Sequence, residues 1–81
     1  MTRLSCSEIK ALVEAVERAR SDMGRGFFWY YLRPDCVLVR DPGLTDVGYL
    51  NLADHVRRHV DRKRWSVEPV CDSGLKLEAK E

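Results

Sequence analysis

The sequence contains few residues of the kinds that cross-link a small domain. It has three cysteines in 81 residues, too few and too odd a number for a disulfide framework. We therefore expect Cys6, Cys36 and Cys71 to be reduced, small buried side chains of a cytoplasmic protein. No Cys-x-x-Cys pair is present, and His55 and His59, four residues apart, supply at most half of a metal site. The sequence predicts no metal and no other cofactor.

Long apolar runs are also missing, and no stretch approaches the roughly 18–20 apolar residues that span a bilayer. The first residues, Met-Thr-Arg-Leu-Ser-Cys-Ser-Glu, lack the apolar core of a signal peptide. The chain is 44% hydrophobic and 33% charged, a balance typical of soluble globular proteins. We expect a single compact domain over residues 1–81, with no membrane partner.

An excess of charge of one sign is absent as well. The 14 basic and 13 acidic side chains leave a net charge of +1, so the chain lacks the overall basic field that drives nonspecific nucleic-acid binding. The basic residues are unevenly spread, however. We call residues 57–64 the basic run, because this stretch contains Arg57, Arg58, Arg62, Lys63 and Arg64. It is interpreted as the polar face of a helix, either solvated or in contact with nucleic acid.

Signatures of catalysis are not found. The sequence has no Gly-x-x-x-x-Gly-Lys phosphate loop, no dinucleotide fingerprint and no carboxylate pair typical of a glycosidase. A cysteine nucleophile would need a histidine base, a group that orients this base and an oxyanion donor, and no pattern marks such a set. We expect a protein that is not an enzyme.

The sequence does contain an aromatic run, Phe-Phe-Trp-Tyr-Tyr at residues 27–31, which holds five of the seven aromatic side chains. In a strand, alternate side chains point to opposite faces. One face would then carry Phe27, Trp29 and Tyr31, and the other Phe28 and Tyr30. Because a small domain can bury only one such face well, rings on the other face should be accessible to a partner. The pattern leaves open which face is exposed.

A helix is predicted near the start of the chain. Ser5 can cap it, Glu8 completes a capping box, and Leu4 can pack against Ile9 as a hydrophobic staple. Apolar residues at three- and four-residue spacing continue to Met23, and the two glycines that follow end the helix. The apolar stripe should pack on a sheet.

The remaining elements complete the order αββαββ. We expect strands at residues 27–32, 36–39, 65–68 and 75–78, and a second helix from an Asn51 cap to about residue 63. Residues 47–50 fit a short extended piece or the first turn of a longer helix, and a loop over 44–50 is the preferred interpretation. Pro69 predicts the end of the third strand or an edge position. The fold class is α+β: a four-stranded antiparallel sheet with two helices on one face and the other face free for solvent or a partner.

Two binding functions could use these features. The favoured one is protein binding, because Tyr, Trp and Arg dominate interface hot spots. Its candidate partner-binding residues are Phe28, Trp29, Tyr30, Tyr31, Arg33, Arg57, Arg58, Arg62 and Arg64, with Arg40 as a further rim residue. The partner could also be a second copy, in a homodimer through the aromatic face or an edge strand. In the alternative, the basic run and exposed rings bind single-stranded nucleic acid.

Residues 25–27, Arg-Gly-Phe, are similar to the start of the RNA-recognition-motif signature. Phe28 and Leu32 depart from that signature, which has a small residue and an aromatic residue at these places. We therefore assign none of the motif's stacking roles to this chain.

In size and plan the chain resembles the short α+β inhibitors encoded by phages and mobile elements, anti-CRISPR proteins among them. This resemblance covers overall character and rests on no shared motif, so it assigns no site residues. It implies an inhibitor that docks on a nucleoprotein complex such as a CRISPR effector. Mimicry of phosphate would require four aspartates to converge in space: Asp35, Asp41, Asp46 and Asp54.

Overall fold

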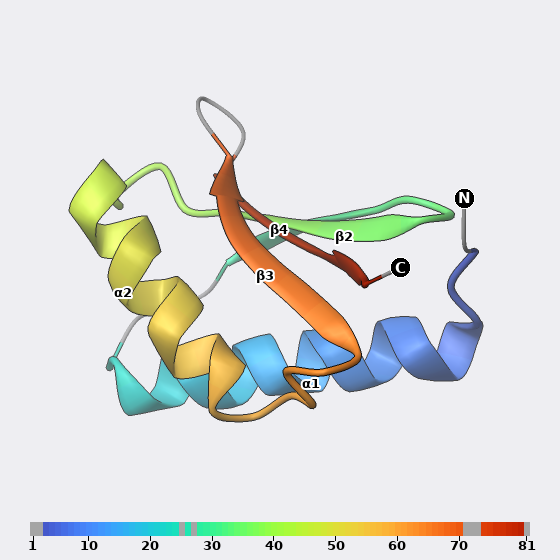
Figure 1. The fold of residues 1–81 in the computed structure, drawn as a ribbon. Helices are drawn as coiled ribbons and strands as arrows, with labels where there is room; N and C mark the ends of the chain where they lie inside the picture. Colours follow the sequence, from blue (N-terminus) through green and yellow to red (C-terminus); the bar gives the residue numbers. More distant parts are fainter. Residues whose placement is uncertain (1–2, 25, 27, 71–73, 81) are drawn as a thin grey trace.

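The structure, a computed structural model, describes residues 3–24, 26, 28–70 and 74–80. The elements follow in the order α1 (Cys6–Asp22), β1 (Trp29–Leu32), β2 (Cys36–Arg40), α2 (Asp46–Arg57), β3 (Trp65–Val70) and β4 (Gly74–Ala79). The strands form one antiparallel sheet in the order β1-β2-β4-β3. Both helices lie against the same face of this sheet (Figure 1). The predicted α+β class and the order αββαββ are confirmed.

α1 begins as the sequence predicts. Ser5 Oγ accepts a hydrogen bond from the Glu8 N–H (3.2 Å), and Glu8 Oε1 accepts one from the Ser5 N–H (2.9 Å). These reciprocal bonds form the capping box and satisfy two N–H groups that a helix otherwise leaves unpaired. After Asp22 the chain turns at Gly24, whose φ of 67° is in the left-handed region.

Glu8 makes this end of the protein sensitive to acid. The hydrogen bonds from Ser5, with the Arg64 guanidinium nearby, hold the pKa of Glu8 below its ordinary value of 4.5. A carboxyl whose pKa falls on folding adds stability above its ordinary pKa, and this stability is lost as the pH falls through the lower folded-state value. We expect Glu8→Gln to reduce the free energy of unfolding near neutral pH, with a deficit that shrinks below the ordinary pKa.

Urea titrations of wild type and Glu8→Gln at a series of pH values measure this deficit. Glu14→Gln, on the exposed side of the same helix, is the control for removal of an unbonded carboxylate. A deficit for Glu8→Gln that does not shrink as the pH falls below the ordinary pKa would contradict the expectation, because protonation of Glu8 in the unfolded chain should remove part of this stability there.

The core lies between the two helices and the sheet. Its strand residues are those that point toward the helices, and they come from the three strands β2, β3 and β4. The largest fully buried side chains are Leu12, Val16, Val37, Val39, Leu52, Val56, Leu75 and Leu77. The apolar stripe predicted for α1 is thus in the core, as is the Leu52–Val56 side of α2.

The second helix begins earlier than predicted. Its N-cap is Thr45, whose Oγ1 accepts a hydrogen bond from the Gly48 N–H (3.2 Å), and α2 starts at Asp46. The expected loop at residues 44–50 and the expected cap at Asn51 are therefore wrong. Glycine is unfavourable in the interior of a helix. Here the Gly48 N–H is in the first turn, and the Thr45 side chain gives it a hydrogen-bond acceptor that the helix itself does not.

α2 also ends earlier than predicted, at Arg57, with Arg58 as its C-cap. The N–H groups of Arg64 and Trp65 both donate to the carbonyl of Asp61 (3.0 and 2.9 Å). This turn brings the chain back to the sheet for β3. The predicted basic helix is wrong, because only the first residue of the basic run is helical and the rest lies in the α2–β3 connection.

The strands lie close to their predicted positions. β3 extends through Pro69 to Val70 and is an edge strand, which confirms the edge position that Pro69 indicated. β1 is described from Trp29, and Phe27 lies outside the described residues. In the part of the chain that the structure describes, no helix is long and apolar enough to cross a membrane.

The thiols differ from one another in burial. Cys36 is buried as expected, and burial, with Asp35 close by, raises the pKa of its thiol. A buried thiol of raised pKa is a poor nucleophile. Cys6, also expected to be buried, is exposed, because the fully buried positions of α1 begin only at Leu12, about two turns further on. Cys71 lies outside the described residues.

Candidate functional site

The sheet face opposite the helices carries a cluster of exposed rings. In the β1–β2 register Trp29 is opposite Arg40, and Tyr31 is opposite Leu38. Cross-strand partners point to the same side of a sheet, so these four side chains lie together on the open face. Trp29 is 54% exposed and Tyr31 46%. We call Trp29, Tyr31, Leu38 and Arg40 the ring face.

Phe28 and Tyr30, the other described aromatic residues of the run, point toward the helices. Phe28 is 4% exposed and belongs to the core, and Tyr30 is half-buried against the same cluster. Phe28 was expected at the binding surface, and this expectation is wrong because its ring is enclosed. Burial raises the pKa of Tyr30, and Glu17 on α1 adds to the shift, so its phenol stays neutral at physiological pH.

The ring face has arginines at both of its ends. Arg40 closes β2 beside Trp29, and Arg33 follows β1 in the turn, where its N–H donates to the carbonyl of Cys36 (2.9 Å). Both side chains are exposed. The open face changes character toward the centre of the sheet, where Lys76 Nζ lies 3.4 Å from Glu78 Oε2 on β4. Among the described residues, the exposed rings of this face therefore lie on β1, beside Leu38 of β2.

The basic run lies at the opposite edge of the sheet, next to β3. One guanidinium nitrogen of Arg57 donates to the carbonyl of Val67 (2.6 Å), and the other donates to Asp54 Oδ1 (3.1 Å). Arg64 pairs with Glu8 and lies over the ring of Trp65, 4.8 Å from its centroid. Arg58 and Arg62 are exposed.

β1 and β3 are the two edges of the sheet, separated by about 14 Å at the usual spacing of neighbouring strands. The rings and the basic run therefore do not form one surface. The sequence placed them together as candidate residues, and the structure separates them.

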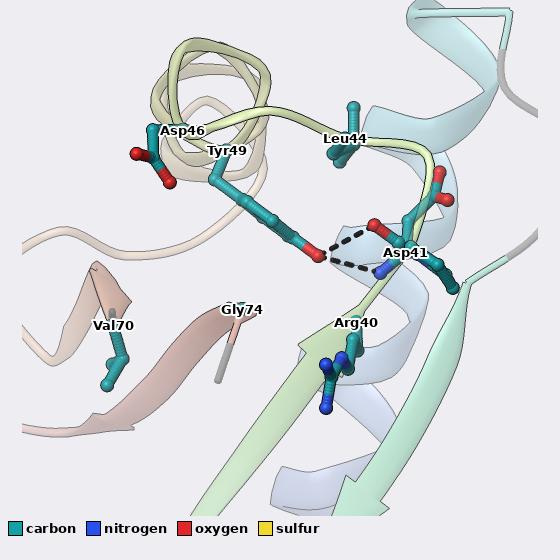
Figure 2. Close-up of a pocket in the computed structure, with 8 residues that line it drawn as sticks. Arg40, Asp41, Leu44, Asp46, Tyr49, Val70 and Gly74 are labelled. Atoms are coloured by element: carbon teal, nitrogen blue, oxygen red, sulfur yellow. Dashed lines mark hydrogen bonds between the residues drawn. The ribbon is translucent and has the colours of Figure 1, made fainter. Parts of the chain in front are cut away.

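A pocket of about 190 Å³ adjoins the ring face where β2 ends. Arg40, Asp41, Leu44, Asp46 and Tyr49 are among its lining residues (Figure 2). The Tyr49 hydroxyl donates to the carbonyl of Asp41 (2.8 Å) and accepts a hydrogen bond from the Asp41 N–H (2.9 Å). These two bonds attach α2 to the end of β2. Among the described lining residues, Tyr49 is the one neutral polar side chain, and these bonds use it for structure.

The acidic convergence that mimicry of phosphate would require is not formed. Asp35 precedes β2 and Asp41 follows it, so the two aspartates lie at opposite ends of a strand. Asp46 lines the pocket beside Asp41, while Asp54 on α2 pairs with Arg57. Four carboxylates spread in this way do not resemble a row of phosphates.

One of the two histidines has a hydrogen-bond contact with α1. His59 Nε2 lies 2.8 Å from Asp22 Oδ2, which connects the segment after α2 to the end of α1. His55 is half-buried on α2. Among the described residues, no group of three or more His, Cys, Asp or Glu side chains is placed to hold a metal ion.

Leu38 is the member of the ring face that the sequence analysis missed. A signal for it was present, since Pro34-Asp35 is a two-residue turn between the first two strands. Such a turn places Arg33 opposite Cys36, and counting outward from it places Tyr31 opposite Leu38.

Comparison of the chain with models of protein families, with curated proteins and with solved structures found no match. The class that the fold and its surface define is a small α+β domain with an aromatic patch on an otherwise polar open sheet face.

Proposed function

We propose that this chain is a non-catalytic protein-binding module of the cytoplasm that docks on a larger protein or nucleoprotein complex through the ring face. The observation that carries this proposal is the exposure of Trp29 and Tyr31 on a paired strand, beside Leu38 and Arg40. Contiguous exposed rings are typical of interaction surfaces, and Trp, Tyr and Arg contribute most of the binding energy in many interfaces.

The ring face has the composition of a small interface. Trp29, Tyr31 and Leu38 form an apolar centre, and Arg33 and Arg40 stand at its ends. An apolar centre with a charged rim is the common arrangement of protein interfaces. The surface that fits it would offer an apolar hollow for the rings and carboxylates opposite the two arginines.

The ring face is also rigid. Ring side chains have few rotatable bonds, and those of β1 are held on a strand paired with β2. Little conformational entropy is lost when such side chains are immobilised by a partner. A short strand can therefore contribute useful binding energy.

The narrower form of the proposal is an inhibitor encoded by a phage or mobile element, which covers a working surface of a complex such as a CRISPR effector. Its support is the small size and α+β plan of the chain. Because the aspartates do not converge, such an inhibitor would act by protein contacts and not by mimicry of phosphate. Inhibition of target cleavage by a purified effector tests this narrower form.

The binding test compares two double variants of similar design. Trp29→Ala with Tyr31→Ala removes both rings. Val47→Ala with Leu50→Ala is the control, because it removes two apolar side chains of α2 that are at least as exposed as the rings (65% and 55%). Immobilised wild type and both variants are exposed to extract, and captured proteins are quantified by mass spectrometry. We expect a specific partner whose recovery falls about tenfold or more for the ring variant only.

A partner retained equally by both double variants would show that docking uses another surface. Direct nucleic-acid binding is tested separately with labelled single strands at low salt, where we expect no binding by the wild type. Binding that weakens steeply with salt and is lost when Arg58 and Arg62 become Glu would instead support the nucleic-acid alternative.

A further inference from the structure

The two edges of the sheet are built differently, and the β3 edge is partly protected. The N–H of Lys80 donates to the carbonyl of Arg64 (2.9 Å), which fixes the alternation of β3: Trp65, Val67 and Pro69 direct their backbone groups away from β4. The Trp65 N–H is bonded to Asp61, and the Val67 carbonyl accepts from Arg57. Pro69 has no N–H.

The β1 edge has none of these devices. The N–H of Arg33 donates to the carbonyl of Cys36 (2.9 Å), so by the same alternation Tyr30 and Leu32 direct their N–H and C=O groups outward. Within residues 3–24, 26, 28–70 and 74–80, nothing pairs with these outward groups. Trp29–Leu32 also contains no proline and no charged residue, the usual protections of an edge strand.

The helix layer does not cover this edge either. Leu32 points to the helix side of the sheet, like its register partner Val37, yet Leu32 is 59% exposed while Val37 is fully buried. With Trp29 and Tyr31 exposed on the opposite face, β1 presents apolar side chains above and below an unpaired backbone. Such a strand is a template for pairing with another strand.

We infer that the β1 edge binds a second copy of this chain, by antiparallel pairing of β1 with β1 about a two-fold axis at Tyr31. In this arrangement Tyr30 of each copy lies opposite Leu32 of the other. Each of these two residue pairs exchanges two hydrogen bonds, so that both outward N–H and both outward C=O groups of each copy are used. Two sheets of four strands become one continuous sheet.

The side chains match under the same two-fold operation. On the open face Tyr31 lies beside Tyr31 of the second copy, and Trp29 lies beside Arg33 of the second copy, within reach of a cation–π contact. On the helix side, Tyr30 of one copy packs against Leu32 of the other. A foreign strand could use the backbone groups, but this reciprocal match is specific to a second copy. The net charge of +1 adds little repulsion.

The contact between the two copies is small. A standard protein interface buries roughly 800 Å² of each partner, about a seventh of the 5327 Å² surface of this chain. Pairing of one four-residue strand covers less than that. We therefore expect a reversible dimer that forms at high micromolar concentration, and a merged ring face at the centre of its open side.

Sedimentation equilibrium between about 1 μM and 1 mM protein, the range of weak complexes, tests the inference. The average mass should rise from 9.4 kDa toward twice that value. In the same samples, hydrogen exchange of the Tyr30 and Leu32 amides should slow as concentration rises, because these amides become bonded. The Tyr31 amide, already directed toward β2, should be unaffected. A mass of 9.4 kDa at every concentration, or a dimer whose Tyr30 and Leu32 amides stay unprotected, would overturn it.

A matched pair of variants separates the strand edge from general surface apolarity. Leu32→Lys places a charge at the edge, and Leu50→Lys places the same charge at a similarly exposed leucine of α2 (59% and 55%). We expect the dimer dissociation constant to rise about tenfold or more for Leu32→Lys and to stay unchanged for Leu50→Lys. Equal effects would contradict edge pairing. If Leu32→Lys does not fold, the exchange measurement on the wild type still decides.

This inference uses the strand edge and does not require the proposed function, which uses the ring face. The dimer and the docking function can therefore be rejected independently of each other. Arg40→Glu, one strand inside the edge, should weaken partner binding and leave the mass distribution unchanged. A monomer that still captures its partner would reject the dimer alone, and a dimer without any partner would reject the docking module alone.

Discussion

Replacing Phe28 by alanine should lower the free energy of unfolding by about 3–5 kcal/mol, whereas the same truncation of the adjacent Trp29 should cost less than about 1 kcal/mol. The two rings are neighbours in sequence, but Phe28, just before β1, belongs to the core, whereas Trp29 lies on the open face, with exposures of 4% and 54%. Truncation of the buried ring leaves a cavity in the core, while truncation of the exposed ring leaves none.

Thermal and urea unfolding of both variants measure this contrast. For a domain of this size, the Phe28→Ala loss corresponds to a fall in the midpoint temperature of more than about 12 °C. Trp29→Ala also removes one of the two fluorescent tryptophans, so unfolding is followed by far-UV circular dichroism. Equal losses for the two variants would show that both rings belong to the core, which would remove the basis of the docking proposal.

Gly74→Ala should be the second severe substitution, with a loss of about 2–5 kcal/mol. Gly74 has φ of 94°, and a Cβ at this position would lie 2.1 Å from the carbonyl oxygen of Val39. That oxygen belongs to the backbone of β2, the central partner of β4, so it cannot move aside without disturbing the sheet. Figure 2 shows Gly74 at the pocket beside the end of β2.

Two other glycines provide graded controls. Gly24 has φ of 67° but open space around its Cβ position, so Gly24→Ala isolates the backbone strain, about 1 kcal/mol. Gly26 has open space and no positive φ, so Gly26→Ala should be nearly neutral. If Gly74→Ala is no worse than Gly24→Ala, the close approach to Val39 does not restrict this position.

Local chemistry explains which parts of the fold were predictable. The capping box of Ser5 and Glu8 depends on residues three positions apart, so the start of α1 could be read directly. The start of α2 was missed because Val47 and Leu50 fit an extended segment and Gly48 disfavours a helix. The hydrogen bond from the Gly48 N–H to Thr45 decides in favour of the helix.

The end of α2 depends on contacts that are distant in sequence. The spacing of Leu52, Val56 and Val60 continues a helical pattern beyond Arg57, which is why the basic run was expected to be helical. In the structure His59 instead bonds to Asp22 at the end of α1, and the chain then turns into β3. No pattern within residues 51–64 contains this information.

Only part of the candidate surface could be predicted: the side on which each ring lies, but not the distance between the rings and the basic run. The alternation of the aromatic run separates Trp29 from Phe28 by local geometry, and exposure confirms the separation. The distance between the rings and the basic run follows from the strand order β1-β2-β4-β3, in which the last two strands do not follow the chain order. That order is set by long-range pairing, so a list of candidate residues could not show that its two halves lie on different edges.

The unequal edges of the sheet also limit how far this protein can assemble. A polymer of sheets needs two adhesive edges on every subunit, one to receive the preceding copy and one to offer to the next. Pro69 and the Arg57 guanidinium on the outer side of β3 hinder strand addition there, so we expect extension at the β1 edge alone. If β1 pairs as proposed, growth by strand addition would end after a single step, so an exposed apolar edge strand would not lead to fibres.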